Sequence, residues 1–594
     1  MIDRQTVSLF IILVLLAGPL RAQQFPYARQ GLDEREAAAH LLGRFTYGPR
    51  PGEVERVAEM GLERWLDTQL SGRLPDPRVQ ELLGAMPALA LSNDQILKTY
   101  PRPGEVLRMA VEAGIVERGE VKENRELRRK VLDYARSKGY RPMRELLGAL
   151  LGQKLVRAVH SENQLQEVLT DFWYNHFYVS LADNQCRPFV LPYERDAIRP
   201  NALGGFRALL GATAKHRAML LYLDNALSSA DERAQTLGDR RAREAIQRRK
   251  QPGINENYAR ELLELHTLGV DGGYTQQDVV EVARAFTGWT VVPERAAFRR
   301  RLAQAENRGM GVIRQADFLF LPFIHDAGSK RILGAEFPAG GGMEEGERVL
   351  DMLSRHPSTA RRIAYKFAVR FHSDQPPESL VKRLADTFTR SRGDTREMVR
   401  ALARSPEFWS PQARAAKIKS PLELTASAVR VLDGDIRPTR ELYDWLSKMG
   451  QPLYAYQAPT GFPDRADAWI NSGTLLNRMN FALSLAAGQV DGIRVHPERL
   501  KTSGNPSPQV LLREYARAVL PGRELDETLK DLAPAVADPD YVRKLSEKAA
   551  AAAGADHPAF EEKDASTVRP LPVAPDQHSR ILGILLGSPQ FQRR

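Results

Sequence analysis

The segment from Asn255 to His266 concentrates side chains capable of acid–base or metal chemistry within a helix-forming stretch. In an α-helix, Asn257, Glu261 and Glu264 stand at positions i, i+4 and i+7 and share one face, whereas His266 points about 200° away from Glu264. Two carboxylates beside an amide can bind a hard cation or share a proton as an acid of raised pKa. Glu261, Glu264 and Asn257 are therefore candidate catalytic residues.

The same two glutamates also have a structural interpretation. Buried carboxylates need partners, and this arginine-rich sequence offers Arg260, Arg284 and Arg195. An ion-paired network that ties helices together is the favoured interpretation of Glu261 and Glu264.

A second hypothesis joins His176, also a catalytic candidate, with His325, Asp326 and Glu261 in a metal site. Two histidines and a carboxylate suit zinc or ferrous iron. The sequence lacks the close spacing of a metal signature such as His-Glu-x-x-His. His176 also ends an apolar helical stripe, which favours a hydrogen-bonded core histidine, and His325-Asp326 is typical of a turn.

Aromatic and amide side chains support a third hypothesis, a groove that stacks on sugar rings and bonds their hydroxyls. The candidate ligand-binding residues are Trp173, Asn175, Asn255, Trp289, Tyr454 and Trp469. The alternative, favoured for Trp173 and Trp289, is that these side chains are core anchors.

Apolar positions that recur every 3.6 residues predict a mainly helical, multi-helical globular protein of two packed lobes. A minor β-hairpin is expected near Gly311 to Ile324, where the helical pattern stops. The predicted helices cover residues 37–42, 54–70, 107–157, 164–177, 254–268, 276–286, 347–371, 377–408 and 471–487.

A Pro-rich segment at 451–469 cannot form regular structure because Pro452, Pro459 and Pro463 interrupt it. A loop of this length is usually functional or a packed cover. We expect it to roof one cleft in which Trp173–His176, Asn255–Glu264 and Tyr454–Trp469 meet.

One short pattern occurs twice. Ser405-Pro406-Glu407-Phe408 is echoed by Ser588-Pro589-Gln590-Phe591, each at the end of a predicted helix. The echo indicates two helical lobes that end in the same way.

The expected organisation has five parts. They are a signal peptide (1–22), a helical core domain (23–440), the Pro/aromatic loop with a return helix of the core (441–490), a variable helical insertion or linker (491–575) and a C-terminal helix end (576–594). The insertion is expected to be loosely attached and to carry no chemistry.

The N-terminus predicts export. Arg4 precedes an apolar run too short to span a bilayer, and Leu20-Arg21-Ala22 offers a small-residue cleavage site. The mature chain is therefore expected to be periplasmic or extracellular, with no transmembrane span, although a retained N-terminal anchor is the alternative. The single cysteine, Cys186, excludes an intramolecular disulfide framework.

Charge and missing motifs narrow the function further. The net charge of +11 favours anionic neighbours, while export makes nucleic acid an unexpected partner. The basic run at 240–250 is interpreted as a solvated loop or helix face, with an anion site as the alternative. The sequence contains no Gly-x-Ser-x-Gly elbow, dinucleotide fingerprint or P-loop, so an ordinary serine hydrolase is disfavoured and no nucleotide cofactor is expected.

Several ordered motifs carry a family resemblance. They include His40-Leu41-Leu42 with Thr46-Tyr47-Gly48-Pro49, Asp171-Phe172-Trp173-Tyr174-Asn175-His176-Phe177, the Asn255–Trp289 hairpin and Ser405-Pro406-Glu407-Phe408. With these motifs the chain resembles a secreted bacterial family, domain of unknown function 1800. The resemblance implies a mainly helical exported protein, often encoded beside a second exported, sulfatase-like family (domain of unknown function 1501). It implies no catalytic role for any residue.

The leading functional prediction is an exported, envelope-associated binding or scaffold protein that acts with an exported partner or an envelope polysaccharide. One alternative is a metal-dependent hydrolase or oxidoreductase that uses the Glu/His cluster. A glycan-binding protein is the other alternative.

Overall fold

The computed structural model describes residues 24–117, 119, 124–231, 234–237, 253–294, 296–500, 506–523, 525–541, 543–544 and 576–594. The predicted signal peptide (1–22), the basic run at 240–250 and residues 545–575 of the predicted insertion lie outside the described residues.

The described chain is mainly helical. The helices of the N-terminal half are α2 (Glu34–Phe45), α3 (Glu53–Met60), α4 (Leu62–Ser71), α5 (Pro77–Gly84), α6 (Asn93–Thr99), α7 (Pro103–Glu112), α8 (Arg125–Ser137), α9 (Met143–His160), α10 (Gln164–His176), α11 (Val190–Pro192), α12 (Phe206–Lys215), α13 (Arg217–Tyr222), α15 (Asn257–Glu261), α16 (Gln276–Ala285) and α17 (Ala296–Asn307). Those of the C-terminal half are α18 (Met343–Arg355), α19 (Pro357–Phe371), α20 (Glu378–Ser391), α21 (Thr395–Ala403), α22 (Pro406–Trp409), α23 (Pro421–Val431), α24 (Arg440–Lys448), α25 (Ser472–Ala486), α26 (Pro508–Val519), α27 (Leu525–Ala537) and α29 (Gln577–Gly587).

Short antiparallel strands account for the rest of the regular structure. The predicted hairpin is confirmed as β2 (Ile313–Gln315) and β3 (Phe318–Phe320), and β1 (Trp289–Val291) pairs with β3 to complete a three-stranded sheet. Two further pairs are β4 (Lys330–Ile332) with β5 (Ala335–Phe337), and β6 (Asp435–Ile436) with β7 (Ile493–Arg494).

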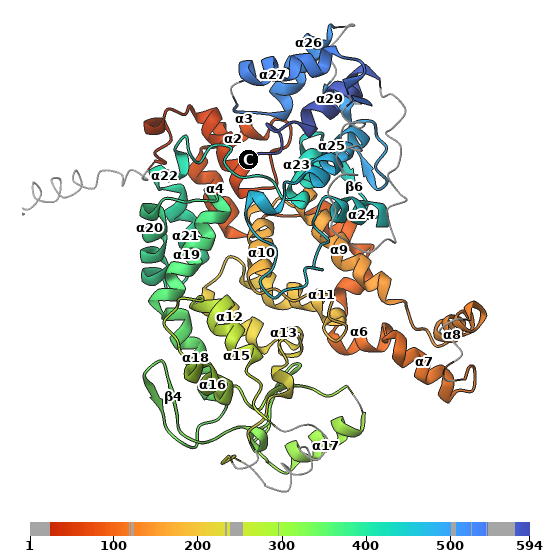
Figure 1. Ribbon diagram of the computed structural model, residues 1–594, viewed down its shortest axis with the longest axis vertical. Helices are drawn as coiled ribbons and strands as arrows, with labels where there is room; N and C mark the ends of the chain where they lie inside the picture. The colour runs from red at the N-terminus through yellow and green to blue at the C-terminus, as the bar shows by residue number, and fades with distance from the viewer. Residues whose placement is uncertain are drawn as a thin grey trace, which may run out of the picture.

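One continuous apolar core runs through the molecule, from Phe25 near the beginning of the described chain to Phe591 near its end. Helices α9 and α10 lie at its middle, with α16 and α18 toward one end and α26, α27 and α29 at the other (Figure 1). The last residues return to the first helices, so that the C-terminus lies beside α2 and α3 (Figure 1).

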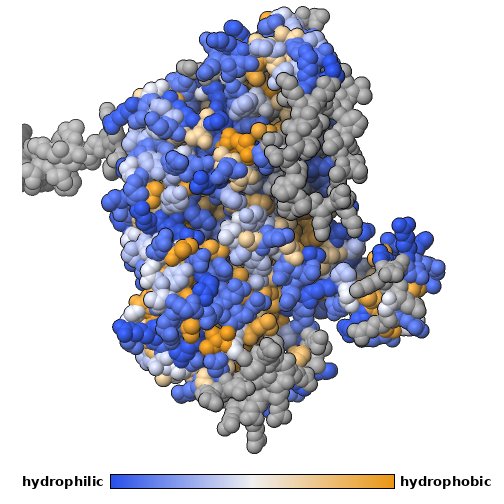
Figure 2. Space-filling view, viewed as in Figure 1, coloured by the Kyte–Doolittle hydropathy of each residue, from blue (hydrophilic) through white to orange (hydrophobic). Residues whose placement is uncertain are grey.

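The structure interrupts five of the predicted helical stretches, 54–70, 107–157, 254–268, 347–371 and 377–408. The predicted helix 107–157 is divided into α7, α8 and α9. Helices α7 and α8 have a small apolar core of their own, and they extend from the body as an arm (Figures 1 and 2). The predicted helix 254–268 is α-helical only over α15, after which Leu262–Thr267 forms a π-helix, η7. The Thr267 hydroxyl donates to the Leu262 carbonyl at 2.6 Å within this wider turn, which suits its longer i to i+5 spacing.

The part of the predicted insertion that the structure describes is not loosely attached. Helices α26 and α27 pack on each other and on α29, and α29 packs along α25. In the described ranges, none of the helices is long and apolar enough to cross a membrane.

Candidate functional site

Two of the three stretches expected to form a cleft, Trp173–His176 and Tyr454–Trp469, are in contact. The Asn175 amide donates to the Phe462 carbonyl at 2.7 Å, and the Phe462 N–H donates to Asn175 Oδ1 at 2.8 Å. The rings of Tyr174 and Tyr454 cross edge to face, 4.8 Å between centroids. Only about 30 Å³ of space is left between α10 and the loop, so the Pro-rich loop is a packed cover rather than the roof of an open cleft.

The third stretch, Asn255–Glu264, does not line the space between α10 and the loop. His176 and His266 are buried and adjacent, and the His176 Nε2–H donates to the His266 carbonyl at 3.0 Å. This hydrogen bond agrees with the favoured interpretation of His176 as a core histidine. Glu261 and Glu264 are half-buried, and burial together with Glu264 raises the pKa of Glu261. His266 therefore faces the core while both glutamates reach toward solvent.

The arginines expected to pair with Glu261 and Glu264 bind other carboxylates instead, which corrects that interpretation. The salt bridges are Arg260–Glu256 at 3.0 Å, Arg284–Asp326 at 2.9 Å and Arg195–Asp196 at 2.6 Å. Each of the three arginines has a carboxylate close in sequence within reach, and for Arg284 this is Glu281 at 2.5 Å.

The proposed metal ligands lie in separate surroundings. His325 is buried, with Nδ1–H donating to the Thr287 carbonyl at 2.8 Å and Nε2 lying 3.3 Å from Glu345. Asp326 binds Arg284, while His176 binds the His266 carbonyl. Within the described ranges, no three His, Cys, Asp or Glu side chains are grouped as a metal ion would need.

The aromatic candidates are mostly buried. Trp173 donates its indole N–H to the Ala202 carbonyl at 3.1 Å, and Trp289 packs between Phe286 and Phe318. Tyr454 and Trp469 are also buried. Asn255, two residues before the start of α15, accepts from the Asn257 N–H at 2.9 Å. None of the four rings presents an open face to a sugar.

A network of buried ion pairs fills the middle of the molecule, where α9, α10 and the Pro-rich loop meet. Lys154 contacts Asp171 at 2.8 Å and Glu194 at 3.6 Å, and Arg199 contacts Glu194 at 2.9 Å. Tyr454 also donates its hydroxyl to Glu194. Burial alone would raise the pKa of Glu194, but Lys154 and Arg199 outweigh it and lower the pKa to about 2. We call this the central ion-pair network.

The network continues toward the C-terminus through Arg370. This guanidinium lies 3.7 Å from Asp171 and 2.8 Å from Glu423, and Glu423 also binds Arg594 at 3.0 Å. Burial would raise the pKa of Glu423, yet Arg370 and Arg594 lower it to about 2. Glu423 therefore lies between the central ion-pair network, in which the charges are paired, and a region in which buried cations outnumber buried carboxylates.

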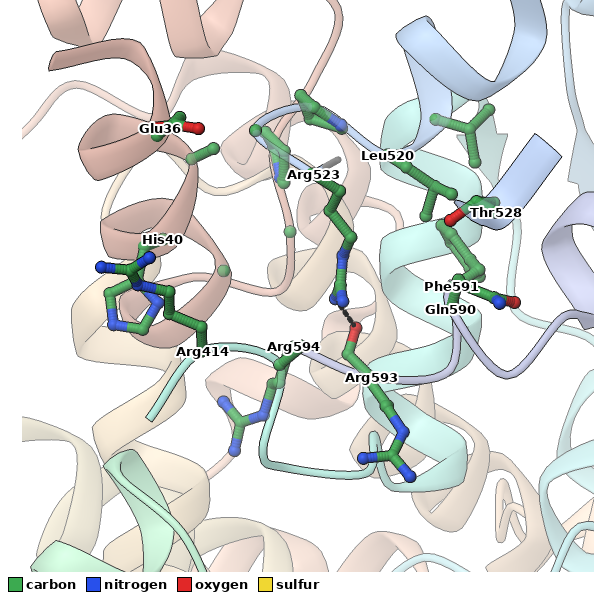
Figure 3. A pocket seen from close by; sticks show the side chains of 18 of the residues that line it. Glu36, His40, Arg414, Leu520, Arg523, Thr528, Gln590, Phe591, Arg593 and Arg594 are labelled. Atoms are coloured by element: carbon green, nitrogen blue, oxygen red, sulfur yellow. Dashed lines mark hydrogen bonds between the residues drawn. The ribbon is translucent and has the colours of Figure 1, made fainter. Parts of the chain in front are cut away.

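Beyond Glu423 lies a hollow of about 760 Å³, the basic pocket (Figure 3). Its walls come from α2, the segment before α23, the turn between α26 and α27, and the last residues of the chain. The cationic side chains that line it are Arg414, Lys419, Arg523, Arg593 and Arg594. Carboxylates also line it, but Glu36, Glu527 and Asp531 are exposed or half-exposed, which leaves Glu423 as the buried one.

Lys419 is the most unusual of these cations. The residue is only 8% exposed, and Nζ lies 3.7 Å from the centroid of the Phe591 ring. Among the described residues, no carboxylate lies within ion-pair distance of Nζ. Burial, Arg523 and Arg594 together lower the pKa of Lys419 well below 10.5. A bound anion would stabilise this buried ammonium, which contacts an aromatic ring but has no counter-ion.

Neighbouring arginines add to this excess of positive charge. Arg44 and Arg478 are fully buried, and each has two guanidinium nitrogens without a hydrogen-bond partner in the part of the chain that the structure describes. Burial and Arg594 lower the pKa of Arg44, and burial lowers that of Arg594 to about 10 although Glu423 opposes it. Arg478 donates to the Lys419 carbonyl at 2.9 Å and so holds the segment that carries the lysine.

The repeated Ser-Pro pattern explains two parts of this geometry. Ser405 and Ser588 each accept from the N–H of the phenylalanine three residues later, at 3.3 Å. The phenylalanine of the first copy, Phe408, accepts a hydrogen bond from His40 through its carbonyl, 2.8 Å away, and that of the second, Phe591, lies against Lys419. Both copies therefore fix a basic side chain at the wall of the pocket.

Arg523 reaches the pocket because the turn between α26 and α27 lies close to α2. Gly522 has φ +74°, and a Cβ there would lie 2.4 Å from the Cβ of Ala39. Only glycine fits this approach without strain. Arg523 then donates to the Arg593 carbonyl at 2.8 Å (Figure 3). The expectation that the insertion carries no chemistry did not anticipate this cation.

The family model for the protein of unknown function family DUF1800 matches residues 40–593. The chain belongs to this family. No curated protein and no solved structure matches the chain. The DUF1800 match covers residues from each wall of the basic pocket, whereas Gly31, Leu32, Glu36, Ala39 and Arg594 of its lining lie outside the matched range.

Sequence reasoning missed the cations of the pocket in this DUF1800 protein. Lys419 and Arg523 stand in stretches without a motif, and the two are brought together only by packing. The signals that pointed toward the site were the Ser-Pro echo and the opening segment His40–Pro49. This arrangement can bind an oxyanion through a lysine and several guanidinium groups.

Proposed function

We propose that the protein is an exported, envelope-associated binding protein that holds an anionic ligand in the basic pocket and serves as an accessory to an exported partner. The observation that carries the proposal is Lys419, a nine-tenths-buried residue in the lining of a hollow of about 760 Å³, whose ammonium has no carboxylate partner in the described chain. An ion buried without a partner costs several kcal/mol, and a bound anion removes that cost.

The ligand chemistry follows from the lining. Phosphate, sulfate and carboxylate groups accept charge-assisted hydrogen bonds from lysine and paired hydrogen bonds from guanidinium. The volume falls within the range of about 300–1,000 Å³ that small-molecule sites occupy. The pocket therefore suits a ligand larger than a single inorganic ion that carries at least one oxyanion.

Export and partner belong to the same proposal. The apolar N-terminal segment supports export, and the net charge of +11 favours an anionic envelope environment. The sulfatase-like exported family that the resemblance implies would be a compatible partner, because sulfate and phosphate esters are themselves anions. Cell fractionation of the tagged full-length chain checks this part. Recovery in the cytoplasm, unchanged by deletion of residues 1–22, would contradict export.

Isothermal titration calorimetry with inorganic phosphate, sulfate and galacturonate tests the binding function. We expect saturable binding of at least one probe by the wild type, and a loss of tenfold or more in Lys419→Met, because charge-assisted contacts contribute about 1.5–3 kcal/mol. At a ligand concentration of 100 times Kd, the unfolding free energy should rise by about 2.7 kcal/mol.

Lys448→Met is the matched control, because Lys448 also lies over an aromatic ring, 5.7 Å from the centroid of Trp445, but is exposed and lies outside the pocket. It should bind each probe as the wild type does. Absence of binding by the wild type, or equal binding by both variants, would sink the proposal.

A further inference from the structure

Lys419 differs chemically from the other cations in the lining of the basic pocket. It is the one lysine among the described residues of that lining, and the other cations are Arg414, Arg523, Arg593 and Arg594. A guanidinium stays protonated in proteins, whereas a buried lysine readily loses its proton and becomes a neutral amine. The neutral amine is a nucleophile and the ammonium is not. Lys419 is therefore the lining cation that can form a covalent bond with a ligand.

The surroundings of Lys419 favour the neutral amine. The residue is almost fully buried, and Arg523 and Arg594 bring positive charge close to it. Glu423 is the buried carboxylate of the lining, but Arg370 and Arg594 already bind it, at 2.8 and 3.0 Å. Burial first, and then Arg523, lower the pKa of Lys419. Each unit by which a lysine pKa falls raises the fraction of neutral amine at pH 7 about tenfold.

Two open groups meet in the basic pocket. Lys419 Nζ has no hydrogen-bond partner in the described chain, yet water can reach it, whereas the partnerless nitrogens of Arg44 and Arg478 are closed to water. Arg523 extends from the turn between α26 and α27 and donates one nitrogen to the Arg593 carbonyl at 2.8 Å (Figure 3). Its guanidinium forms no salt bridge with a described carboxylate. The pocket thus offers an amine and an unpaired guanidinium within one hollow.

We propose that Lys419 captures a 2-oxo carboxylic acid as a reversible imine in the basic pocket. The carboxylate of the ligand binds arginines of the lining, Arg523 among them, and the neighbouring carbonyl carbon reacts with Nζ of Lys419. The inference rests on the anion-binding function proposed for the pocket and names the ligand class for it. A carboxylate and a carbonyl on adjacent carbons match a guanidinium and an amine in the same hollow.

The covalent step needs no other reactant. The lone pair of Nζ attacks the carbonyl carbon and forms a C–N bond, and the carbonyl oxygen then leaves as water with the two hydrogens of the amine. Nothing is oxidised or reduced, and addition of water reverses the step and releases the ligand unchanged. When the imine nitrogen is protonated, the ligand's own carboxylate lies beside it and supplies the counter-ion that Lys419 lacks in the described chain.

Reductive trapping of the full chain with pyruvate tests the inference. Cyanoborohydride converts an imine into a stable secondary amine, and peptide mass spectrometry then measures the labelling rate of each lysine. We expect Lys419 to be labelled about tenfold faster than Lys448 at pH 7, because a larger fraction of it is neutral amine. Lys448 is the matched control within the same molecule, since it also lies over an aromatic ring but is exposed and outside the pocket.

Acetone, which is pyruvate with a methyl group in place of the carboxylate, tests the role of the anion. The ratio of Lys419 to Lys448 labelling should be higher with pyruvate than with acetone. Arg523→Gln should raise the half-saturating concentration of pyruvate by about tenfold, the effect of one charge-assisted contact. With acetone, the same variant should move the pH midpoint of Lys419 labelling upward, because Arg523 lowers the pKa of Lys419.

Lys419→Arg separates charge from covalent chemistry. Arginine keeps the positive charge but cannot form the imine, so the variant should still bind inorganic phosphate in calorimetry while pyruvate labelling at this position disappears. Phosphate binding that depends on Lys419, with Lys419 and Lys448 labelled at equal rates, would overturn this inference and leave the proposed function standing. No binding of any anion, together with the same labelling ratio for pyruvate and acetone, would end both.

Discussion

The central ion-pair network and the basic pocket are both made of buried charges, and they share Glu423, but they differ in how those charges are matched. In the network, Lys154, Arg199 and Arg370 each contact at least one buried or half-buried carboxylate, and only about 30 Å³ of space remains beside them. In the basic pocket, Lys419 has no carboxylate partner among the described residues, and the adjoining space is about 760 Å³.

This difference distinguishes a network that stabilises the fold from a pocket that is a candidate binding site. A matched pair satisfies its members and excludes water, so it can fix the Pro-rich loop through Tyr454 and Glu194. A buried cation without a counter-ion does not stabilise the fold, and burying it lowers the unfolding free energy of the protein. This loss of stability is consistent with a ligand whose charge completes the pair.

The largest expected effect comes from breaking a matched pair. Glu194→Gln removes one of the two carboxylates that Lys154 and Arg199 each contact and leaves an uncompensated positive charge in the buried network, so we expect the unfolding free energy to fall by about 3–5 kcal/mol. Urea denaturation measures it. The control is Glu378→Gln, because Glu378 forms an exposed pair with Arg361, and its replacement should leave the unfolding free energy nearly unchanged. Equal effects of the two variants would show that burial of the pair does not matter.

An intermediate effect should appear in acid. Glu423 has a folded pKa of about 2 against an ordinary 4.5, so its contribution is complete above pH 4.5 and is lost as the pH falls toward 2. The contribution amounts to about 3 kcal/mol. The stability difference between wild type and Glu423→Gln should therefore shrink across that window in denaturation experiments. Buried His266, whose pKa is about 3, weakens both proteins equally below pH 6.5 and cancels in the difference.

The smallest effect should have the opposite sign. Lys419→Met removes an unmatched buried charge, and we expect the ligand-free protein to become more stable by about 1 kcal/mol, after loss of the ring contact with Phe591. Because the folded pKa of Lys419 lies below 10.5, wild-type stability should rise with pH from that lowered pKa to 10.5, and the variant should lack this rise. A destabilised Lys419→Met would mean that the lysine is matched after all.

Secondary structure was predicted correctly where it depends on the pattern of residues close together in the sequence. Apolar periodicity identified α10, and a change of pattern identified the hairpin of β2 and β3. The π-helix η7 was missed because its sequence satisfies the α-helical pattern equally well, and the wider turn depends on packing. The partners of Glu261 were predicted wrongly because sequence shows which charges exist but not which of them meet.

By itself, the sequence determined the helical class, the family and the Ser-Pro echo, all of which depend on residues near one another in the chain. Tertiary structure alone decided the candidate site. Lys419, Arg523 and Arg594 come from segments up to 175 residues apart, and they meet because the last residues of the chain return to α2 (594 − 419 = 175). Whether a buried charge is matched depends on distances of a few ångströms across such segments, and no local pattern encodes them.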